Sequence, residues 1–323
     1  MSLAADLPRW SGGAAEPARC IAAIDDWVAQ LLGCGIVEAF GTSAPHASGA
    51  PALEFLDEFS ARNWDFRAGR ERNLAEEPLL TPDQVAAVRV AVGPLGLDGT
   101  PAPRRARYDS VLMTGGMVRA GIVKPRYLRE LSDAGLSFDE AVFLGAFRPF
   151  AGDEARVAKL LGVGGSDEVD AMAAGLEQAF GPLQEPVVRE YSAGSRNASW
   201  REESWDVGGR MLRVIAAPSS DPLNRRANTA DTFRFWAASR KPAPASVLVI
   251  TTPVYVPYQG AIAVEVLGLE FGLEVETVAT SASANDLGEL SQEFAPHHQL
   301  QELRSAIVGL RSLRSKLDAG QPR

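Results

Sequence analysis

The sequence predicts an α/β protein: a Rossmann-like, mainly parallel sheet with helices on both faces, preceded by a helical N-terminal segment. Three observations support this fold class. The first third of the chain carries helical patterns, β-rich runs later alternate with helical patterns, and three of those runs are apolar throughout. Continuous apolar runs are typical of strands covered on both faces, and strand–helix alternation is typical of parallel sheets. We therefore expect a helical extension or lid with a linker at 1–107 and an α/β domain at 108–323.

The N-terminal segment is expected to contain three helices. Apolar residues recur at helical spacing in 18–32 and again in 51–59. Thr81 is suited to cap a third helix that begins with Pro82, because proline fits the first helical position. Four glycines or prolines among the first seven residues of 93–107 indicate a linker.

The remaining chain alternates between two patterns. Five β-rich runs are expected to form strands, at 109–114, 141–144, 211–216, 246–252 and 273–279. Five helical patterns accompany them, at 125–134, 168–180, 228–238, 258–271 and 299–317. The helices are long enough to cross over between parallel strands.

Composition excludes several classes of partner. The chain has 32 lysines and arginines against 41 aspartates and glutamates, and no basic tail, which argues against nucleic acid and anionic membranes. It lacks a signal-peptide pattern and any apolar run of the roughly 20 residues that a membrane span needs. Cys20 and Cys34 alone make no disulfide framework, and we expect both to be small buried side chains in a cytoplasmic protein.

Ligands of open parallel sheets bind beyond the carboxyl ends of the strands. Four loops at those positions carry glycines, arginines, hydroxyls or amides, in 114–119, 144–149, 217–231 and 251–260. Glycines there allow backbone N–H groups to approach a phosphate or carboxylate, and arginines add positive charge. The residues expected to contact the ligand are Gly115, Gly116, Arg119, Gly145, Arg148, Arg225, Arg226, Asn228, Thr229, Thr251, Thr252, Tyr255, Tyr258 and Gln259.

Three of the four loops also have a purely structural interpretation. The Gly115–Gly116 pair suits a tight strand exit flanked by solvated basic residues. Asn228 and Asp231 have the spacing of a helix capping box, and 251–260 suits a proline-shaped turn with packed tyrosines. The joint occurrence of four such loops at one edge favours a small-molecule site.

Acid–base chemistry at this edge is expected to depend on carboxylates. The chain has no Gly-x-Ser-x-Gly elbow, no Walker motif and no full dinucleotide fingerprint, and its three histidines lack zinc-ligand spacing. The candidates, in falling order, are Asp221, Glu190 and Asp231. Asp221 leads because it lies on a strand-exit loop and has no capping role. No metal site is expected.

Several motifs resemble the YdcF–SanA–ElyC family of bacterial Rossmann-like domains. The apolar strand that enters Gly-Gly in 108–116, the segment 226–232 and the strand before Thr251-Thr252 carry the resemblance, which covers residues 108–323. Arg226 and Thr232 depart from the family's serine and asparagine at those positions. Tyr255 stands near the family's histidine. The resemblance implies an α/β domain of largely unassigned chemistry and adds S-adenosylmethionine to the candidate ligands.

These features together lead to one functional expectation with two alternatives. We expect a hydrolase or transferase that acts on a small anionic metabolite, nucleotide-like or phosphorylated, with arginine electrostatics and one carboxylate as general base. The first alternative is a non-catalytic protein that binds a nucleotide or S-adenosylmethionine. The second is a scaffold that forms a homo-oligomer through its N-terminal helices and helix 299–317.

Overall fold

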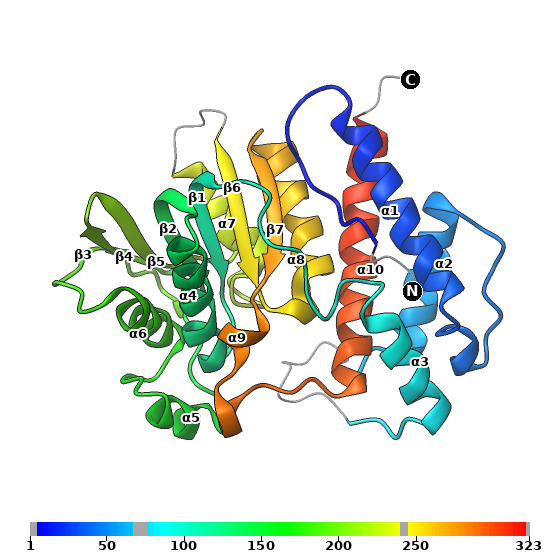
Figure 1. Cartoon of the computed structure of the whole chain (residues 1–323), viewed down its shortest axis with the longest axis horizontal. Helices are drawn as coiled ribbons and strands as arrows, with labels where there is room; N and C mark the ends of the chain where they lie inside the picture. Colours follow the sequence, from blue (N-terminus) through cyan, green and yellow to red (C-terminus); the bar gives the residue numbers. More distant parts are fainter. Residues whose placement is uncertain (1–4, 67–76, 240–244, 321–323) are drawn as a thin grey trace. The chain divides into compact units, whose positions relative to one another are not determined.

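The computed structural model describes residues 5–66, 77–239 and 245–320, which form two compact units (Figure 1). Unit 1 is drawn from 1–100, 253–265 and 293–323, and unit 2 from 101–252 and 266–292. The predicted boundary at residue 107 is near the first border between the units. The two later segments of unit 1 were not part of that prediction.

Unit 1 is helical. Its helices are α1 (Glu16–Gly33), α2 (Gly49–Asn63), α3 (Pro82–Val92), α8 (Val256–Ala263) and α10 (Pro296–Ala319), with single 3-10 turns η1 (Glu38–Phe40) and η4 (Pro253–Tyr255). The long helix α10 packs against α2 and α8, and buries an apolar stripe at helical spacing that includes Leu303, Ile307 and Leu310. The prediction of a helical N-terminal segment is confirmed.

Local sequence explains where α1 and α3 lie. Thr81 and Gln84 form a reciprocal capping box at the start of α3, as the proline that follows Thr81 suggested. The apolar positions of α1 are buried, among them Trp27, whose indole N–H donates to the Leu95 carbonyl at 3.1 Å. Cys20 is buried as expected, whereas Cys34 is only half-buried.

Unit 2 contains a seven-stranded sheet in the order β3-β4-β5-β2-β1-β6-β7. The strands are β1 (Arg107–Thr114), β2 (Ser137–Gly145), β3 (Val187–Tyr191), β4 (Trp200–Val207), β5 (Arg210–Ala216), β6 (Ser246–Thr251) and β7 (Glu274–Ala279). The pairs among β5, β2, β1, β6 and β7 are parallel, and β3–β4 and β4–β5 are antiparallel. The sheet is therefore mixed and mostly parallel, within an α/β fold.

Strands β3 and β4 were not predicted. Every residue of β3 is exposed, and β4 carries Arg201, Glu202 and Glu203 in succession, so neither run has the apolar character of a covered strand. The prediction found the central strands because they are buried on both faces.

Successive strands are added on both sides of β1. The path β1–β2–β5 moves to one side, and β6–β7 lies on the other. Helices α4 (Val118–Asp133) and α6 (Glu168–Phe180) pack against each other on one face, while α7 (Thr229–Ala238) lies on the opposite face (Figure 1). The short helices α5 (Glu154–Leu160) and α9 (Ala282–Asn285), the 3-10 turns η3 (Arg196–Ala198) and η6 (Gly288–Leu290), and the π-turn η5 (Val264–Glu270) complete the elements.

Helix α4 begins seven residues before the position the sequence predicted. Pro125 was expected near the helix start, but it lies inside α4, which begins at Val118. Helix α4 packs closely on α6, because Gly121 and Gly175 allow the two backbones to meet. A Cβ added at Gly175 would lie 1.9 Å from the Gly121 carbonyl oxygen.

Candidate functional site

The parallel register brings the carboxyl ends of the central strands to one edge of the sheet. Leu144 of β2 pairs with Thr114, the last residue of β1, and Gly145 pairs with Ala216, the last residue of β5. On the other side of β1, Thr251 ends β6. The loops that begin at residues 115, 146, 217 and 252 therefore leave the sheet along this carboxyl edge.

Glu168, in the first turn of α6, connects the first two of these loops. Its Oε1 accepts the Gly116 amide at 2.5 Å, and its Oε2 accepts the Ala146 amide at 3.3 Å. Burial raises the pKa of Glu168 above its usual value, against the opposing charges of Arg148 and Arg226. A carboxylate that the sequence analysis did not select thus lies between the predicted glycine loops.

Arg148 and Glu154 form a second buried connection. The guanidinium donates to both oxygens of Glu154, at 2.6 and 2.9 Å, and to the Gly116 carbonyl at 2.8 Å. Glu154 also accepts the amides of Val118 and Ala151, each at 2.9 Å. Burial opposes ionisation of Glu154, but Arg148 and these amides together lower its pKa below the usual value.

Lys124 lies inside this edge and is completely buried. Its ammonium donates to the Thr114 carbonyl at 2.5 Å, the Thr114 hydroxyl at 2.9 Å and the Gly115 carbonyl at 3.2 Å. The Thr114 hydroxyl lies 3.2 Å from that of Thr251, so polar groups join the ends of β1 and β6. Burying an ammonium requires such hydrogen bonds, and Lys124 has them.

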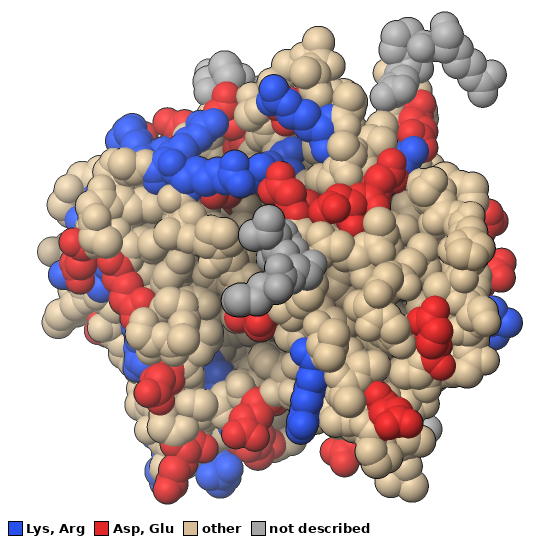
Figure 2. Space-filling model, turned by 45° about the vertical axis from the view of Figure 1, so that its right-hand side comes forward, with Lys and Arg blue, Asp and Glu red and all other residues tan. Residues whose placement is uncertain are grey.

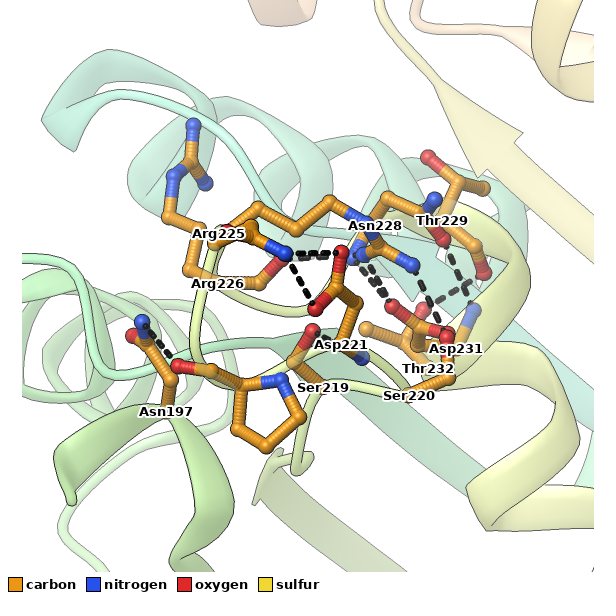
Figure 3. A network of polar contacts seen from close by, with 12 residues as sticks. Asn197, Ser219, Ser220, Asp221, Arg225, Arg226, Asn228, Thr229, Asp231 and Thr232 are labelled. Carbon is orange, nitrogen blue, oxygen red and sulfur yellow. Dashed lines mark hydrogen bonds and ion pairs between the residues drawn. The ribbon is translucent and has the colours of Figure 1, made fainter.

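The loop after β5 forms a compact polar network (Figure 3). Asn228 and Asp231 form the predicted capping box of α7. Arg225 donates to the Asp231 carboxylate at 2.5 Å and to the Ser220 hydroxyl at 2.8 Å. Burial alone would raise the pKa of Asp231, but these hydrogen bonds lower it below the usual value.

Asp221 differs from Asp231 in its partners. Both of its carboxylate oxygens accept from the Asn224 side chain, at 2.9 and 3.1 Å. Within the described residues, Asp221 has no ion pair, whereas the carboxylate of Asp231 is held by Arg225 and by the α7 cap. Of the carboxylates of this loop, Asp221 is therefore the more available to a ligand.

Arg119 lies in the first turn of α4, and its side chain bonds to a backbone carbonyl of unit 2. Its Nε donates to the Leu290 carbonyl at 2.6 Å, and one terminal nitrogen lies 3.9 Å from the carboxylate of Asp153. Arg226 and Thr229, like Arg148, stand on loops or helix starts along the carboxyl edge, with Arg226 and Thr229 drawn in Figure 3.

Glu190 lies on the outer strand β3, three strands away from β2. Along the strand direction Glu190 is in register with the carboxyl edge. It pairs with Arg201, Arg201 pairs with Ala216, and Ala216 pairs with Gly145. With strand spacings of about 4.8 Å, Glu190 is roughly 14 Å from Gly145. The structure therefore does not place Glu190 beside the other candidate residues.

Tyr255, Tyr258 and Gln259 follow β6 but belong to unit 1. Tyr255 and Gln259 are buried, and the ring of Tyr255 meets Phe294 edge-on with centroids 6.0 Å apart. Thr252, the last residue of unit 2 before this segment, is half-buried. A ligand-binding role for these four residues stays a prediction.

The sequence analysis did not select two buried carboxylates at this edge, Glu168 and Glu154. An acid in the first turn of a helix is ordinary, because it favours the helix dipole, and Glu154 and Glu168 both occupy such positions. The one usable signal was Glu168 itself, which follows the Asp167 cap and stands in an otherwise apolar stripe of α6.

Within 5–66, 77–239 and 245–320, no group of three histidine, cysteine, aspartate or glutamate side chains is arranged to hold a metal ion. His298 instead caps α10, where its Nδ1 accepts the Ala295 amide at 3.2 Å, and its ring lies 4.0 Å from that of His297. A search of the described helices for a membrane span found none of sufficient length and hydropathy. Figure 2 shows acidic and basic side chains on the same face of the molecule.

Comparison with known proteins identifies the family. A family model described as the Rv3785 N-terminal domain matches residues 11–96, which contain α1, α2 and α3. Protein Rv3785 of Mycobacterium tuberculosis (strain H37Rv), described as uncharacterized, is 30% identical over 325 residues, which cover 92% of this chain and 90% of that protein. The chain belongs to the Rv3785 family. Two further Rv3785-family proteins match to the same extent, MT3893 of M. tuberculosis (strain CDC 1551) and Mb3814 of Mycobacterium bovis, both described as uncharacterized.

Membership of the Rv3785 family corrects the resemblance to YdcF–SanA–ElyC proteins. The matching family model is that of Rv3785, and it covers the N-terminal helices, for which the sequence analysis had recognised no counterpart. The motifs that carried the resemblance are short, and an apolar strand that ends in glycine occurs in many α/β sheets. The mycobacterial relatives agree with a bacterial origin. No solved structure matches the chain.

Proposed function

We propose that the chain is an enzyme of hydrolase or group-transfer type that binds a small anionic metabolite at the carboxyl edge of its sheet. One observation carries this proposal: the edge at which the loops after β1, β2, β5 and β6 emerge is also where the strand order changes direction, between β1 and β6. In a Rossmann-like sheet, such a switch point is where ligands bind. The charges at this edge are consistent with an anionic ligand, because the positive charges of Arg148 and Arg226 both act on the buried carboxyl group of Glu168 there.

The proposed roles follow from the partners of each side chain. Arg226 binds the anionic group, and Asp221 is the general base, because its carboxylate has only the neutral Asn224 as a side-chain partner among the described residues. Gly115, Gly116 and Gly145 allow the loops to approach closely. Arg225 and Asp231 hold each other and shape the loop after β5.

A non-catalytic binding protein is the second candidate. It is favoured by the commitment of Asp231 to the α7 cap and by the distance of Glu190 from the other residues, which leave Asp221 as the single proposed base. The ligand would then be a nucleotide or S-adenosylmethionine. A homo-oligomer that assembles through the helices of unit 1 is compatible with either candidate.

A thermal-shift screen of the full chain tests binding. The probes are inorganic phosphate, AMP, ADP, glucose 6-phosphate and S-adenosylmethionine, each at graded concentrations. Binding to the native state at a hundredfold excess over Kd stabilises it by about 2.7 kcal/mol, so at least one probe is expected to raise Tm by several degrees. Arg226→Ala and, to a smaller degree, Arg119→Ala should reduce that shift, while Arg107→Ala serves as the exposed control.

Mass spectrometry of the recovered probe separates the two candidates. Conversion of the probe by the wild type and its loss in Asp221→Asn supports the enzyme. A probe that raises Tm but is recovered intact supports the binding protein. If no probe shifts Tm, or if Arg226→Ala and Arg119→Ala both leave the shift unchanged, the proposed anion site is wrong.

A further inference from the structure

The carboxylate of Glu168 joins the loops of two strands at one point. It accepts one backbone amide from the loop after β1 and one from the loop after β2, each on a different oxygen. A carboxylate can accept both amides because each of its two oxygens is an acceptor. A glutamine side chain offers only one acceptor oxygen, and its NH₂ group would face the second N–H. The side chain is buried, so this geometry is shielded from competing water.

The space for this carboxylate is provided by the glycines that the sequence analysis assigned to the ligand. A Cβ added at Gly115 would lie 2.6 Å from Oε1 of Glu168, and one at Gly145 would lie 3.1 Å from its Cδ. Neither glycine has a positive φ, so backbone conformation does not require them. Glu168 therefore explains Gly115, while Gly145 is required by Met172, whose Cε would lie 2.9 Å from the added Cβ, together with Glu168.

Both backbone polar groups of Gly116, its N–H and its carbonyl oxygen, are hydrogen-bonded to side chains. Glu168 accepts its amide N–H, and Arg148 donates to its carbonyl oxygen at 2.8 Å. Two residues further on, the Val118 amide donates to Glu154, the partner of Arg148. The segment between β1 and α4 is thus fixed by side chains that follow β2.

The same turn of α6 also reaches the loop after β5. Asp167, the N-cap of α6, forms an ion pair with Arg196. The next residue, Asn197, donates from its side chain to the Pro222 carbonyl at 3.2 Å and accepts the Ser219 amide on its own carbonyl at 2.7 Å. Glu168 thus contacts the loops after β1 and β2, and the adjacent Asp167 is linked through Arg196 and Asn197 to the loop after β5.

We propose that Glu168 is the positioning residue of the carboxyl-edge site, where its carboxylate fixes the loops after β1 and β2 relative to each other. The contacts above support the positioning of the loops. The expected effect on ligand affinity rests in addition on the proposed function. Glu168 acts through the two loops and does not touch the ligand. Removing its charge should therefore loosen residues 115–118 and 145–148 and weaken binding, with the sheet intact.

Ionisation of Glu168 gives the proposal a pH dependence. The charged groups around it are Arg148 and Glu154 after β2, Arg226 after β5, Lys124 on α4, and Asp167 and Asp170 on α6 itself. Because burial raises the pKa of Glu168, it becomes protonated at a higher pH than an exposed glutamate. Protonation removes one acceptor, so the loops should open more as pH falls through that raised pKa.

Hydrogen exchange of the full chain, followed by mass spectrometry, tests this inference. The variants are Glu168→Gln and, as the matched control, Glu177→Gln, an exposed glutamate on the same helix. In Glu168→Gln, exchange at 115–118 and 145–148, corrected for the intrinsic rate, should rise about tenfold, as expected for one lost buried hydrogen bond. Exchange within β1, and within β2 as far as Leu144, should match the wild type, and the control should change nowhere.

The pH series distinguishes positioning from general stabilisation. Wild-type loop exchange, again corrected for the intrinsic rate, should rise toward the Glu168→Gln level as pH falls, and the variant should show no such rise. If Glu168→Gln does not fold, this wild-type series decides alone. Unchanged loops in the variant, an increase spread evenly over unit 2, or a flat wild-type series would each overturn the inference.

Affinity for inorganic phosphate, measured by calorimetry, completes the test. It should fall about tenfold in Glu168→Gln and stay the same in Glu177→Gln. An exchange increase confined to the loops together with unchanged affinity would refute the role in the site. A wild type that binds none of the five thermal-shift probes would contradict the proposed function instead, because the exchange experiment needs no ligand.

Discussion

The two ends of strand β1 carry charged side chains in opposite ways. At the amino end, Arg107 and Asp139 form an ion pair in which both side chains are more than half exposed. At the carboxyl end, Lys124 and Glu154 are buried and Glu168 lies beside them. Exposed ion pairs contribute little to stability, while buried charges cost desolvation energy that only full hydrogen bonding offsets. The carboxyl end therefore holds buried charges whose desolvation is offset by hydrogen bonds, such as those that Glu154 accepts from Arg148 and Val118.

That contrast supports a division of labour within unit 2. Apolar residues with alternating orientation, such as Val111 and Met113 on β1 and Phe143 on β2, form the core beneath α4 and α6. Apart from Glu202 in the middle of β4, the buried charged groups of the described part of unit 2 lie where the strands end and the loops begin. A buried charge network kept at the switch point of the sheet is what a preorganised binding site needs.

The largest expected effect comes from breaking the buried pair. Arg148→Met leaves Glu154 charged, 1% exposed and without its guanidinium partner, and it also releases the Gly116 carbonyl. Loss of one partner from a buried ion pair destabilises a protein by about 3–5 kcal/mol. Urea unfolding of the full chain should show a loss of that size.

The matched variant at the other end of β1 is Arg107→Met. Its ion pair is exposed, so its unfolding midpoint should coincide with that of the wild type. Equal losses in Arg148→Met and Arg107→Met would remove the distinction between the two ends.

A smaller effect is expected from adding a methyl group beside Glu168. In Gly115→Ala, the new Cβ would lie 2.6 Å from Glu168 Oε1 and 2.9 Å from the Leu144 carbonyl oxygen, so the loop or the carboxylate must shift. Overpacking of this kind costs about 1–3 kcal/mol. Gly164→Ala is the control, because nothing lies within 4 Å of a Cβ there and its φ is not positive.

Thermal unfolding of both glycine variants checks this difference. Gly115→Ala should lower Tm, and Gly164→Ala should leave it unchanged or raise it slightly. A neutral Gly115→Ala would mean that the loop after β1 is not held by Glu168 in the way described.

The sequence was sufficient for the central sheet and for the loops at its carboxyl edge. Continuous apolar runs such as 247–250 identify covered strands, and glycine after such a run identifies the exit. It was not sufficient for β4, which carries Arg201, Glu202 and Glu203. Glu202 pairs with Arg189 of β3 and Arg213 of β5, a compensation that only tertiary structure provides, while Arg201 pairs with Glu203 on β4 itself.

The sequence predicted which loops lie at the carboxyl edge better than it predicted which of their side chains interact. Asn228 and Asp231 were found with their capping alternative, and the structure shows that capping. Glu168 escaped selection because its position in the first turn of α6 is where acids commonly occur. The sequence indicates that Lys124 adds positive charge near the loop after β1, whereas its burial and its hydrogen bonds to Thr114 and Gly115 arise only from the strand–helix turn.

Hydrogen exchange of the wild-type chain, with and without a saturating concentration of the probe that gives the largest thermal shift, locates the ligand most directly. The account predicts slower exchange in the ligand-bound state at 114–119, 145–149 and 217–231, with β3 and the β3–β4 turn unaffected. Protection confined to β3 and β4, or to helices α1, α2 and α3, would contradict a site at the carboxyl edge of the sheet.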